Sequence, residues 1–330
     1  MMTLPRRKFF QLAAGIAVLP ASTRVVRAQT YPARPITVVV PYAAGGPGDT
    51  VARIISERIK AALGQPLVIE NVTGANGSIA TGRVARAAAD GYTLSLGLWN
   101  THVSNGAMYD LGYDVLKDFE PVALLASFSS MIAVRKTVPS NNLKELIAWL
   151  KVKPDNATQG SAGVGSMGHV GGVYFQKITE TEIRHVPYRG SAPAMQDLLS
   201  GQIDMMIDAP AVILPQLRAG TIKVLAVLAR MRLAQAPDIP TADEAGLPGL
   251  YVSNWFGLWA PKGTQKEIIG RLNAAAVSSL ADPAAQKSLA DLGYEISPRD
   301  QQTPEALSAF QRAEIEKWWP IIKAARIKGD

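Results

Sequence analysis

The chain has 330 residues, 48% hydrophobic and 18% charged, which is enough for about two globular domains of ordinary composition. It has no cysteine, which excludes disulfides and thiolate metal sites, and its three histidines, His102, His169 and His185, do not cluster in the sequence. We therefore predict no metal site and no cofactor. The formal net charge of +7 does not support nucleic-acid binding, because no basic block follows the first 28 residues.

Residues 1–28 are predicted to be an export signal. Basic residues at 6–8 precede an apolar stretch, and Val26 and Ala28 suit cleavage after Ala28. The letters "RRKFFQL" also resemble a twin-arginine signal, and an ordinary secretory signal is the alternative. This segment has five basic residues and no acidic one, so the remainder, with 29 basic and 27 acidic residues, is nearly neutral. No later apolar run reaches the 18 or so residues of a membrane span, so we expect the chain not to span a membrane itself.

The next segment alternates short β-rich runs with amphipathic helices. Apolar residues recur at helical spacing after Asp49, which we expect to be the N-cap of its helix. This alternation is typical of a parallel, doubly wound sheet. The predicted elements are a strand at 36–40, a helix at 49–63, a strand at 66–70, a helix at 78–89 and a strand at 92–98.

The same pattern restarts after Asn141 or Asn142, one of which is expected to cap a helix. Three helices without strands of their own then finish the chain. The predicted strands are 156–163, 183–188, 203–209, 222–229 and 251–261, the helices between them are 167–179, 192–201 and 212–220, and the final helices are 265–281, 283–293 and 303–327.

These elements predict an α/β protein of two lobes, each a twisted, mainly parallel sheet flanked by helices. We expect the final helices to pack on the first lobe, so that the chain crosses between lobes twice, near 125–135 and 250–257. The predicted lobes are residues 29–130 plus 255–330, and residues 131–254, with a ligand cleft between them. A double connection of this kind suits hinge closure over a ligand.

A glycine loop, "PYAAGGPGD", joins the first predicted strand to its helix. Gly45 and Gly46 allow the backbone to approach a ligand, and the helix N-terminus adds unpaired N–H groups. A nucleotide-binding P-loop is excluded, because no lysine or arginine appears before Arg53. From the residues alone, anion or carboxylate binding and a tight turn without a ligand both stay open.

A second glycine loop, "GVGSMG" at residues 163–168, formally matches a dinucleotide-binding pattern. The following strand ends without the acidic residue that this reading requires, so dinucleotide binding is disfavoured. The nucleophile elbow of a hydrolase is also incomplete, because Val164 replaces its first glycine. A secreted hydrolase using Ser166 and His169 remains an alternative, and a second carboxylate-binding loop is the favoured interpretation.

A third loop follows the strand at 183–188. Tyr188 and Ser191 offer hydroxyl groups there, and Arg189 offers a charged contact to a carboxylate or, alternatively, a surface ion pair. Asp208, at the end of the next strand, is expected near the cleft, whereas Asp204 is expected to be structural.

Taken together, these segments resemble the substrate-binding proteins of tripartite tricarboxylate transporters, also called the Bug family. The resemblance runs in order through nearly the whole chain after the signal. It is carried by "YPARPITVVVPYAAGGPGD", "ENVTGANGSIATGRVARAAADGYTL", "YDVLKDFEPVALLA", "GSAGVGSMGH", "HVPYRGSAPAMQDLLSGQIDMMID", "IPTADEAGLPGL" and "WFGLWAPKGT".

The resemblance implies a two-lobed periplasmic binding protein of the type II kind, with no enzymatic activity. Such a protein captures a small carboxylate, for example a di- or tricarboxylate, an aromatic acid or an acidic amino acid. It delivers this ligand to the membrane subunits of a transporter, and we expect it to be a monomer. A sensor that presents its liganded form to a signalling partner is the other alternative.

The family's ligand contacts, largely main-chain N–H groups and bridging waters, carry over to matching positions here. In the first lobe they are Tyr42, Ala44, Gly45, Gly46, Asp49, Asn76, Gly77 and Ser78. In the second lobe they are Ser161, Ala162, Ser166, His169, Tyr188, Ser191 and Asp208. The variable segment "LWNTHVSN" adds Asn100, Thr101 and His102 as specificity candidates. The chain departs from the family at Val72 and Thr73, where a basic residue and proline are usual.

Overall fold

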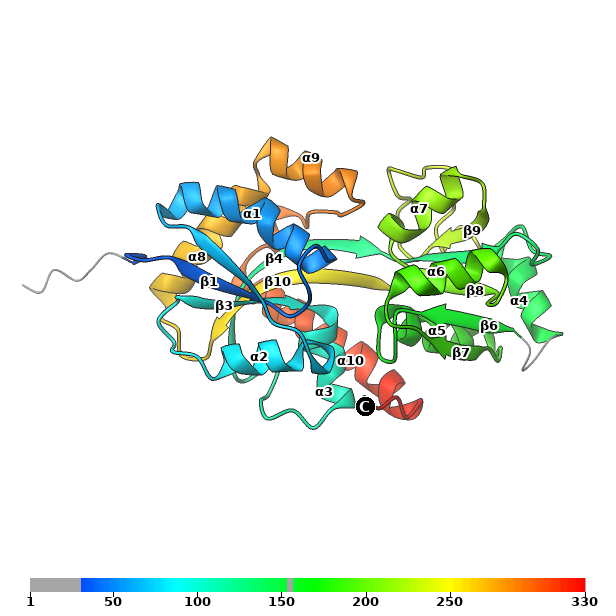
Figure 1. The fold of residues 1–330 in the computed structure, drawn as a ribbon, viewed down its shortest axis with the longest axis horizontal. Helices are drawn as coiled ribbons and strands as arrows, with labels where there is room; N and C mark the ends of the chain where they lie inside the picture. The colour runs from blue at the N-terminus through cyan, green and yellow to red at the C-terminus, as the bar shows by residue number, and fades with distance from the viewer. Residues whose placement is uncertain (1–30, 153–156, 330) are drawn as a thin grey trace, which may run out of the picture. The chain divides into compact units, whose positions relative to one another are not determined.

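Two five-stranded sheets, each flanked by helices, organise the chain (Figure 1). The structure is a computed structural model that describes residues 31–152 and 157–329. The predicted export signal, residues 1–28, lies outside the described residues.

The first sheet has the strand order β2-β1-β3-β10-β4. Strand β1 pairs in parallel with β2 and β3, and β10 pairs antiparallel with β3 and β4. Its strands are β1 (Ile36–Val40), β2 (Leu67–Asn71), β3 (Thr93–Leu98), β4 (Phe119–Ser129) and β10 (Ser253–Pro261). Its helices are α1 (Pro47–Leu63), η1 (Ala75–Gly77), α2 (Ser78–Ala85), the π-helix η2 (Asn100–Ser104), α3 (Asn105–Met108), α8 (Lys266–Leu280), α9 (Pro283–Asp291), η3 (Arg299–Gln301) and α10 (Pro304–Ala324).

The second sheet has the order β7-β6-β8-β5-β9. Strand β6 pairs in parallel with β7 and β8, whereas β5 pairs antiparallel with β8 and β9. Its strands are β5 (Met131–Arg135), β6 (Thr158–Ser161), β7 (Arg184–Pro187), β8 (Met205–Asp208) and β9 (Ile222–Val227), and its helices are α4 (Leu143–Lys151), α5 (Met167–Thr179), α6 (Ser191–Ser200) and α7 (Pro210–Arg218).

Each sheet contains one antiparallel strand, and in each case it is the strand that arrives from the other sheet. Strand β5 follows β4 after the single residue Ser130, and β10 follows the last elements of the second sheet. An arriving strand enters where the parallel strands end, so it must run against them. Met131 accordingly pairs with Asp208, and Phe256 pairs with Leu98. The predicted two-sheet α/β fold is confirmed, and the loops that follow the parallel strands lie at the edges where the chain crosses.

The side chains of β5 point alternately to the two faces of the second sheet, and each face has its own apolar core. Met131 and Ala133 pack with α6 and α7, whereas Ile132 and Val134 pack on the other face with α4 and α5. Successive strand residues point to opposite faces, so a strand covered on both faces is apolar throughout. All four of these side chains are fully buried.

The final helices cover the first sheet, as predicted. Helix α8 packs on α1 and β4, and α10 packs on β4, η2 and α3 (Figure 1). Helix α10 also meets the returning crossing segment, where Lys317 Nζ donates to the carbonyl oxygen of Tyr251 at 2.7 Å. Trp318 stands edge-on to Tyr174 of α5 with ring centroids 5.6 Å apart, so tryptophans serve packing here.

Asp204 is structural, as its sequence position suggested. Its carboxylate accepts the N–H of Thr158 at 2.8 Å and the Nε of Arg135 at 2.9 Å. It therefore ties β5 and β6 to the start of β8, the strand that ends at Asp208.

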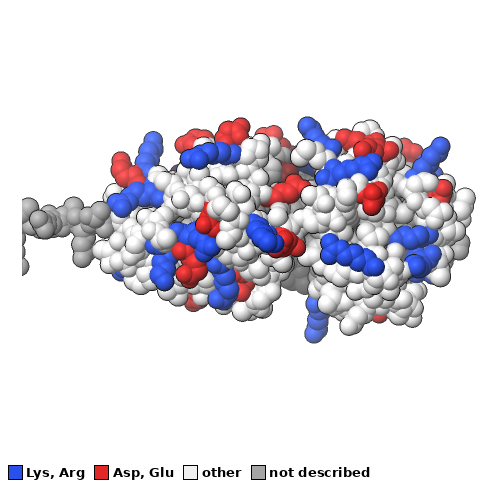
Figure 2. Space-filling model, turned by 90° about the horizontal axis from the view of Figure 1, so that it is seen from above, with Lys and Arg blue, Asp and Glu red and all other residues white. Residues whose placement is uncertain are grey.

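Two further features concern the charges on the surface and the length and apolarity of the helices. Acidic and basic side chains are interspersed over the face shown in Figure 2. Among the described residues, no helix combines the length and the apolarity that crossing a membrane requires.

Candidate functional site

Glycine-containing loops follow four parallel strands. The first loop, residues 41–46, links β1 to α1, and residues 72–74 lead from β2 to η1. The second loop, residues 162–166, links β6 to α5, and the third loop, residues 188–190, links β7 to α6. Ligands of α/β proteins bind at such carboxyl ends of strands.

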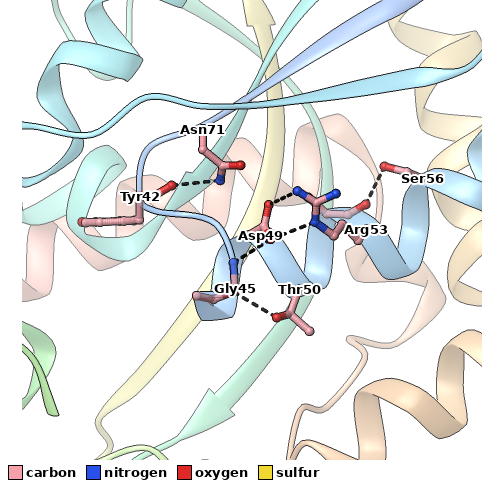
Figure 3. Close-up of polar contacts among 9 residues, drawn as sticks. Tyr42, Gly45, Asp49, Thr50, Arg53, Ser56 and Asn71 are labelled. Atoms are coloured by element: carbon pink, nitrogen blue, oxygen red, sulfur yellow. Dashed lines mark hydrogen bonds and ion pairs between the residues drawn. The ribbon is translucent and has the colours of Figure 1, made fainter. Parts of the chain in front are cut away.

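Asp49 stabilises the first loop from within α1 (Figure 3). Its carboxylate accepts the N–H of Gly45 at 2.8 Å and is bidentate with Arg53 at 2.8 and 3.0 Å. These bonds, above all those from Arg53, hold the pKa of Asp49 below its usual range. The expectation that Asp49 is the N-cap is wrong, because the helix begins at Pro47 and its N-cap is Gly46. The side chain of Asp49 is 3% exposed, so it shapes the loop from behind.

Asp49→Ala should therefore loosen the first loop. We expect the free energy of unfolding at pH 7 to fall by about 2 kcal/mol, because one buried carboxylate with charged and backbone partners is lost. The contribution of Asp49 is present above its unfolded pKa and is lost in acid, because its folded pKa is the lower one. Urea unfolding measures this change. Arg53→Gln, which keeps the Gly45 bond, is the matched control and should cost less; equal costs would contradict the role of that bond.

Tyr42 and Asn76 join the first loop to η1. The Tyr42 hydroxyl donates to the Oδ1 of Asn76 at 3.1 Å, and Asn71 Nδ2 donates to the carbonyl oxygen of Tyr42 at 2.9 Å. Burial raises the pKa of the Tyr42 hydroxyl, which therefore stays protonated and able to donate. Asn105, which the sequence did not single out, exchanges hydrogen bonds with Asn76 at 2.9 and 3.0 Å. It also donates to the Oγ of Ser78 at 3.0 Å.

Gly77, the last residue of η1, lies so close to the first loop that no larger residue fits. Its φ is +85°, and a Cβ atom there would lie 2.7 Å from Thr101 Cγ2 and 2.9 Å from Pro41 Cβ. This close approach explains a glycine at a predicted site position.

The three residues predicted to set specificity, at the start of η2, are buried. Thr101 and His102 are fully buried, and Asn100 is 9% exposed. The Thr101 hydroxyl accepts the N–H of Leu98 at 3.0 Å, and His102 stacks on Trp259 with ring centroids 3.9 Å apart. The Thr101 and His102 side chains thus face buried neighbours, and their expected role in specificity stays a prediction. The π-helix η2 turns them inward.

Ser166 and His169 form a helix cap and not a nucleophile–base pair. The Oγ of Ser166 accepts the backbone N–H of His169 at 3.3 Å, while the Nδ1 of His169 accepts the N–H of Gly165 at 3.1 Å. Ser161 is fully buried, and its Oγ contacts the Nε2 of His185 at 2.7 Å. The alternative hydrolase reading therefore has no support from the Ser166–His169 geometry.

Two histidines that are 16 residues apart in the sequence meet beside the second loop. His169 on α5 and His185 on β7 stack with ring centroids 3.7 Å apart and planes 2° from parallel. The pKa of each imidazole is lowered to about 4, that of His185 by burial and that of His169 by burial and then by the neighbouring His185. Only the tertiary pairing of a helix with an edge strand brings these rings together.

Tyr188 of the third loop and Asp208 at the end of β8 are polar groups in contrasting environments. The Tyr188 hydroxyl donates to Asp197 Oδ2 at 2.7 Å, and burial followed by this carboxylate raises its pKa to about 12. Asp208 Oδ1 accepts the N–H of Ala209 at 2.7 Å, while its buried Oδ2 has no hydrogen-bond partner in the described residues. Burial raises the pKa of Asp208, and Ser191 beside it opposes that shift. Arg189 is exposed and forms no ion pair within the described chain.

The second loop also touches an element of the first sheet. A Cβ atom on Gly165, whose φ is +73°, would overlap the thioether end of Met108 on α3. Met108 was not singled out in the sequence, because nothing in its local pattern distinguishes it from an ordinary core residue. Gly165 of the second loop and Met108 of α3, a helix of the first sheet, are therefore in contact.

A cavity of about 430 Å³ lies apart from these loops, and none of the predicted ligand contacts lines it. Its wall is formed by Val277, Leu280, Ala281, Gln286, Ala290, Tyr294, Ile296, Ser297, Arg299 and Gln302. Among residues 31–152 and 157–329, no group of three or more histidine or acidic side chains is placed to hold a metal ion.

Known protein sequences are similar to this chain over almost its whole length. The family model for the tripartite tricarboxylate transporter family receptor matches residues 51–327. A protein encoded in the TAR-I ttuE–ttuC′ intergenic region of Agrobacterium vitis is 37% identical, over 94% of this chain and 91% of that protein. Protein BugT of Bordetella pertussis is 33% identical, over 96% of this chain and 98% of its own length.

Solved structures agree with these relatives. MatC from Rhodopseudomonas palustris, with bound malate, is 40% identical with a TM-score of 0.78, covering 88% of this chain and 100% of MatC. Rpa4515 from R. palustris, with adipate, is 35% identical with a TM-score of 0.79, covering 90% of this chain and 99% of its own. The periplasmic binding protein BugD is 37% identical with a TM-score of 0.77, covering 91% and 100%. The chain belongs to the tripartite tricarboxylate transporter receptor family, a family of periplasmic solute-binding proteins.

Proposed function

We propose that this chain is exported, loses residues 1–28 near Ala28, and captures a small carboxylate for the membrane subunits of a tripartite tricarboxylate-type transporter. The ligand would lie in a cleft between residues 29–130 plus 255–330 and residues 131–254. The observation that carries the proposal is the contact of Gly165 with Met108, which brings a glycine loop of the second sheet to the first. The related structures with malate and adipate support a carboxylate as the ligand class.

Main-chain donors suit this ligand. The N–H groups of Ala44 in the first loop and Val164 in the second have no acceptor among the described residues. A carboxylate has less charge than a triphosphate, so backbone N–H groups and helix N-termini suffice without a lysine. We propose that the ligand is contacted by Tyr42, Ala44, Gly45, Gly46, Asn76, Gly77, Ser78, Asn100, Ala162, Ser166, Tyr188, Ser191 and Asp208. Asp49, Thr101, Ser161 and His169 would support these contacts from behind.

We propose binding without catalysis. Ser161 and His185 form a serine–histidine hydrogen bond, yet Ser161 is fully buried and its oxygen also accepts the N–H of Gly163 at 3.2 Å. A nucleophile must reach its substrate, so this pair is better suited to holding the loop than to attacking a ligand.

Thermal unfolding of residues 29–330 tests the proposal. L-Malate, adipate, citrate, benzoate and L-glutamate would each be added to the purified chain. A ligand at 100 times its Kd stabilises the native state by about 2.7 kcal/mol, so at least one acid should raise the Tm by several degrees. Dimethyl adipate, which lacks the carboxylates, is the matched control and should leave the Tm unchanged. If no acid raises the Tm or releases heat in calorimetry, the carboxylate proposal is wrong.

A further inference from the structure

The stacked imidazoles hold two separate points of the second loop. His169 Nδ1 accepts the N–H of Gly165 at 3.1 Å. His185 Nε2 lies 2.7 Å from Ser161 Oγ, which in turn accepts the N–H of Gly163 at 3.2 Å. The two rings, 3.7 Å apart, thus connect α5 and β7 to the same short stretch of backbone.

This arrangement depends on uncharged rings. Nδ1 of His169 accepts a hydrogen bond only without a proton, so a second proton would place two donors face to face. Two cationic rings in a stack would also repel each other. Of the charged groups on neighbouring elements, Arg184 beside His185 and Lys177 on α5 are exposed. Neither they nor Asp208 at the end of β8 form an ion pair with either ring in the described chain.

We infer that His169 and His185 are positioning residues for ligand capture, which as a neutral stacked pair hold the second loop in its binding conformation without touching the ligand. This inference rests on the proposed function. It moves His169 from the predicted ligand contacts to a supporting role and adds His185, which the sequence did not single out. Protonation of His169 Nδ1 releases the N–H of Gly165, and a positive charge on either ring disfavours the stack, so protonation weakens capture.

The position of the held residues explains why capture should depend on the pair. Gly165 is the residue that meets Met108 of α3, and Val164 beside it presents an N–H without an acceptor. If Gly165 moved, its contact with Met108 and the free N–H of Val164 would both change position. The pKa of each ring, about 4, keeps the pair neutral at pH 7, so the loop is held under ordinary conditions.

Four single variants of residues 29–330 test the pair at pH 7 with L-malate as the calorimetric probe. His169→Leu removes the acceptor for Gly165, and we expect about tenfold weaker binding. His169→Asn places an amide oxygen near the position of Nδ1 and should bind within about threefold of wild type. For the same reason, His185→Phe, which keeps a ring but no nitrogen, should weaken binding more than His185→Gln.

Two measurements need no ligand. Amide exchange at Gly165 should accelerate at least tenfold in His169→Leu and return to the wild-type rate in His169→Asn. In an NMR titration of the ¹³C-labelled histidines, His169 and His185 should both titrate below pH 5. In His185→Gln the midpoint of His169 should rise, because the neighbouring imidazole no longer opposes its protonation.

Three results would overturn the inference: wild-type malate affinity in His169→Leu, unchanged exchange at Gly165 in that variant, or either ring titrating near pH 6.5. Failure of the wild-type chain to bind malate would count against the carboxylate proposal for that acid. Positioning of the loop would then be judged by exchange and titration alone, so the two failures are distinguishable. If His169→Leu does not fold, His169→Asn and the wild-type titration still decide.

Discussion

Gly165→Ala should weaken carboxylate binding by about tenfold to a hundredfold. The φ of Gly165 is +73°, a conformation that costs an L-residue about 1–2 kcal/mol. The new Cβ atom would also overlap the end of Met108, so the second loop and α3 must move apart. Overpacking of this kind typically costs 1–3 kcal/mol, and about 1.4 kcal/mol corresponds to tenfold in affinity. Calorimetry with L-malate measures the change.

The chain offers a matched control for this variant. Gly64 ends α1 with a φ of +72°, and a Cβ atom there would meet nothing within 4 Å. Gly64→Ala therefore introduces the same backbone strain without the contact, and should lower stability while leaving malate affinity unchanged. Met108→Ala in the Gly165→Ala background should restore part of the affinity by making room. Wild-type affinity in Gly165→Ala would show that the contact with α3 is not needed for capture.

Acidification from pH 6.5 to 4.5 should lower the free energy of unfolding steeply. His102 is fully buried and its pKa is lowered to about 3, while those of His169 and His185 are about 4. An unfolded histidine titrates near 6.5, so the unfolded chain binds more protons over this range. The stabilisation is complete above about pH 6.5 and is lost as the pH falls toward the folded pKa values.

The expected slope is large. Near pH 5 the three histidines together take up almost three protons on unfolding, which corresponds to about 4 kcal/mol per pH unit. Asp208, Glu295 and Glu314, whose pKa values are raised by burial, act in the opposite sense. The double variant His169→Asn with His185→Gln isolates the histidine contribution, because it leaves these carboxyl groups in place. Its slope in urea unfolding should be smaller by more than half, and parallel curves would contradict the assignment.

Much of the fold, and the proposed position of the site, followed from local patterns. Apolar spacing at 3.6 and 2 residues predicted the helices and strands, because one face of each element must be buried. The glycines of "AAGGPGD" and "GVGSMG" predicted loops with accessible N–H groups, since a glycine backbone adopts turns that other residues avoid. The strandless final helices predicted their packing on the first sheet, and the ordered segments from "YPARPITVVVPYAAGGPGD" to "WFGLWAPKGT" predicted the family.

Only the tertiary structure determined the contacts between residues that are far apart in the chain. His169 and His185 come from a helix and an edge strand, and Met108 meets Gly165 from the other sheet. The same holds for the burial of Thr101 and His102, specificity candidates from the sequence that the π-helix η2 places against buried neighbours. Local sequence sets backbone conformation and amphipathicity, whereas packing of distant elements determines which polar groups face a ligand and which hold the loop from behind. The physical reason is that burial and hydrogen bonding between distant segments depend on the whole fold.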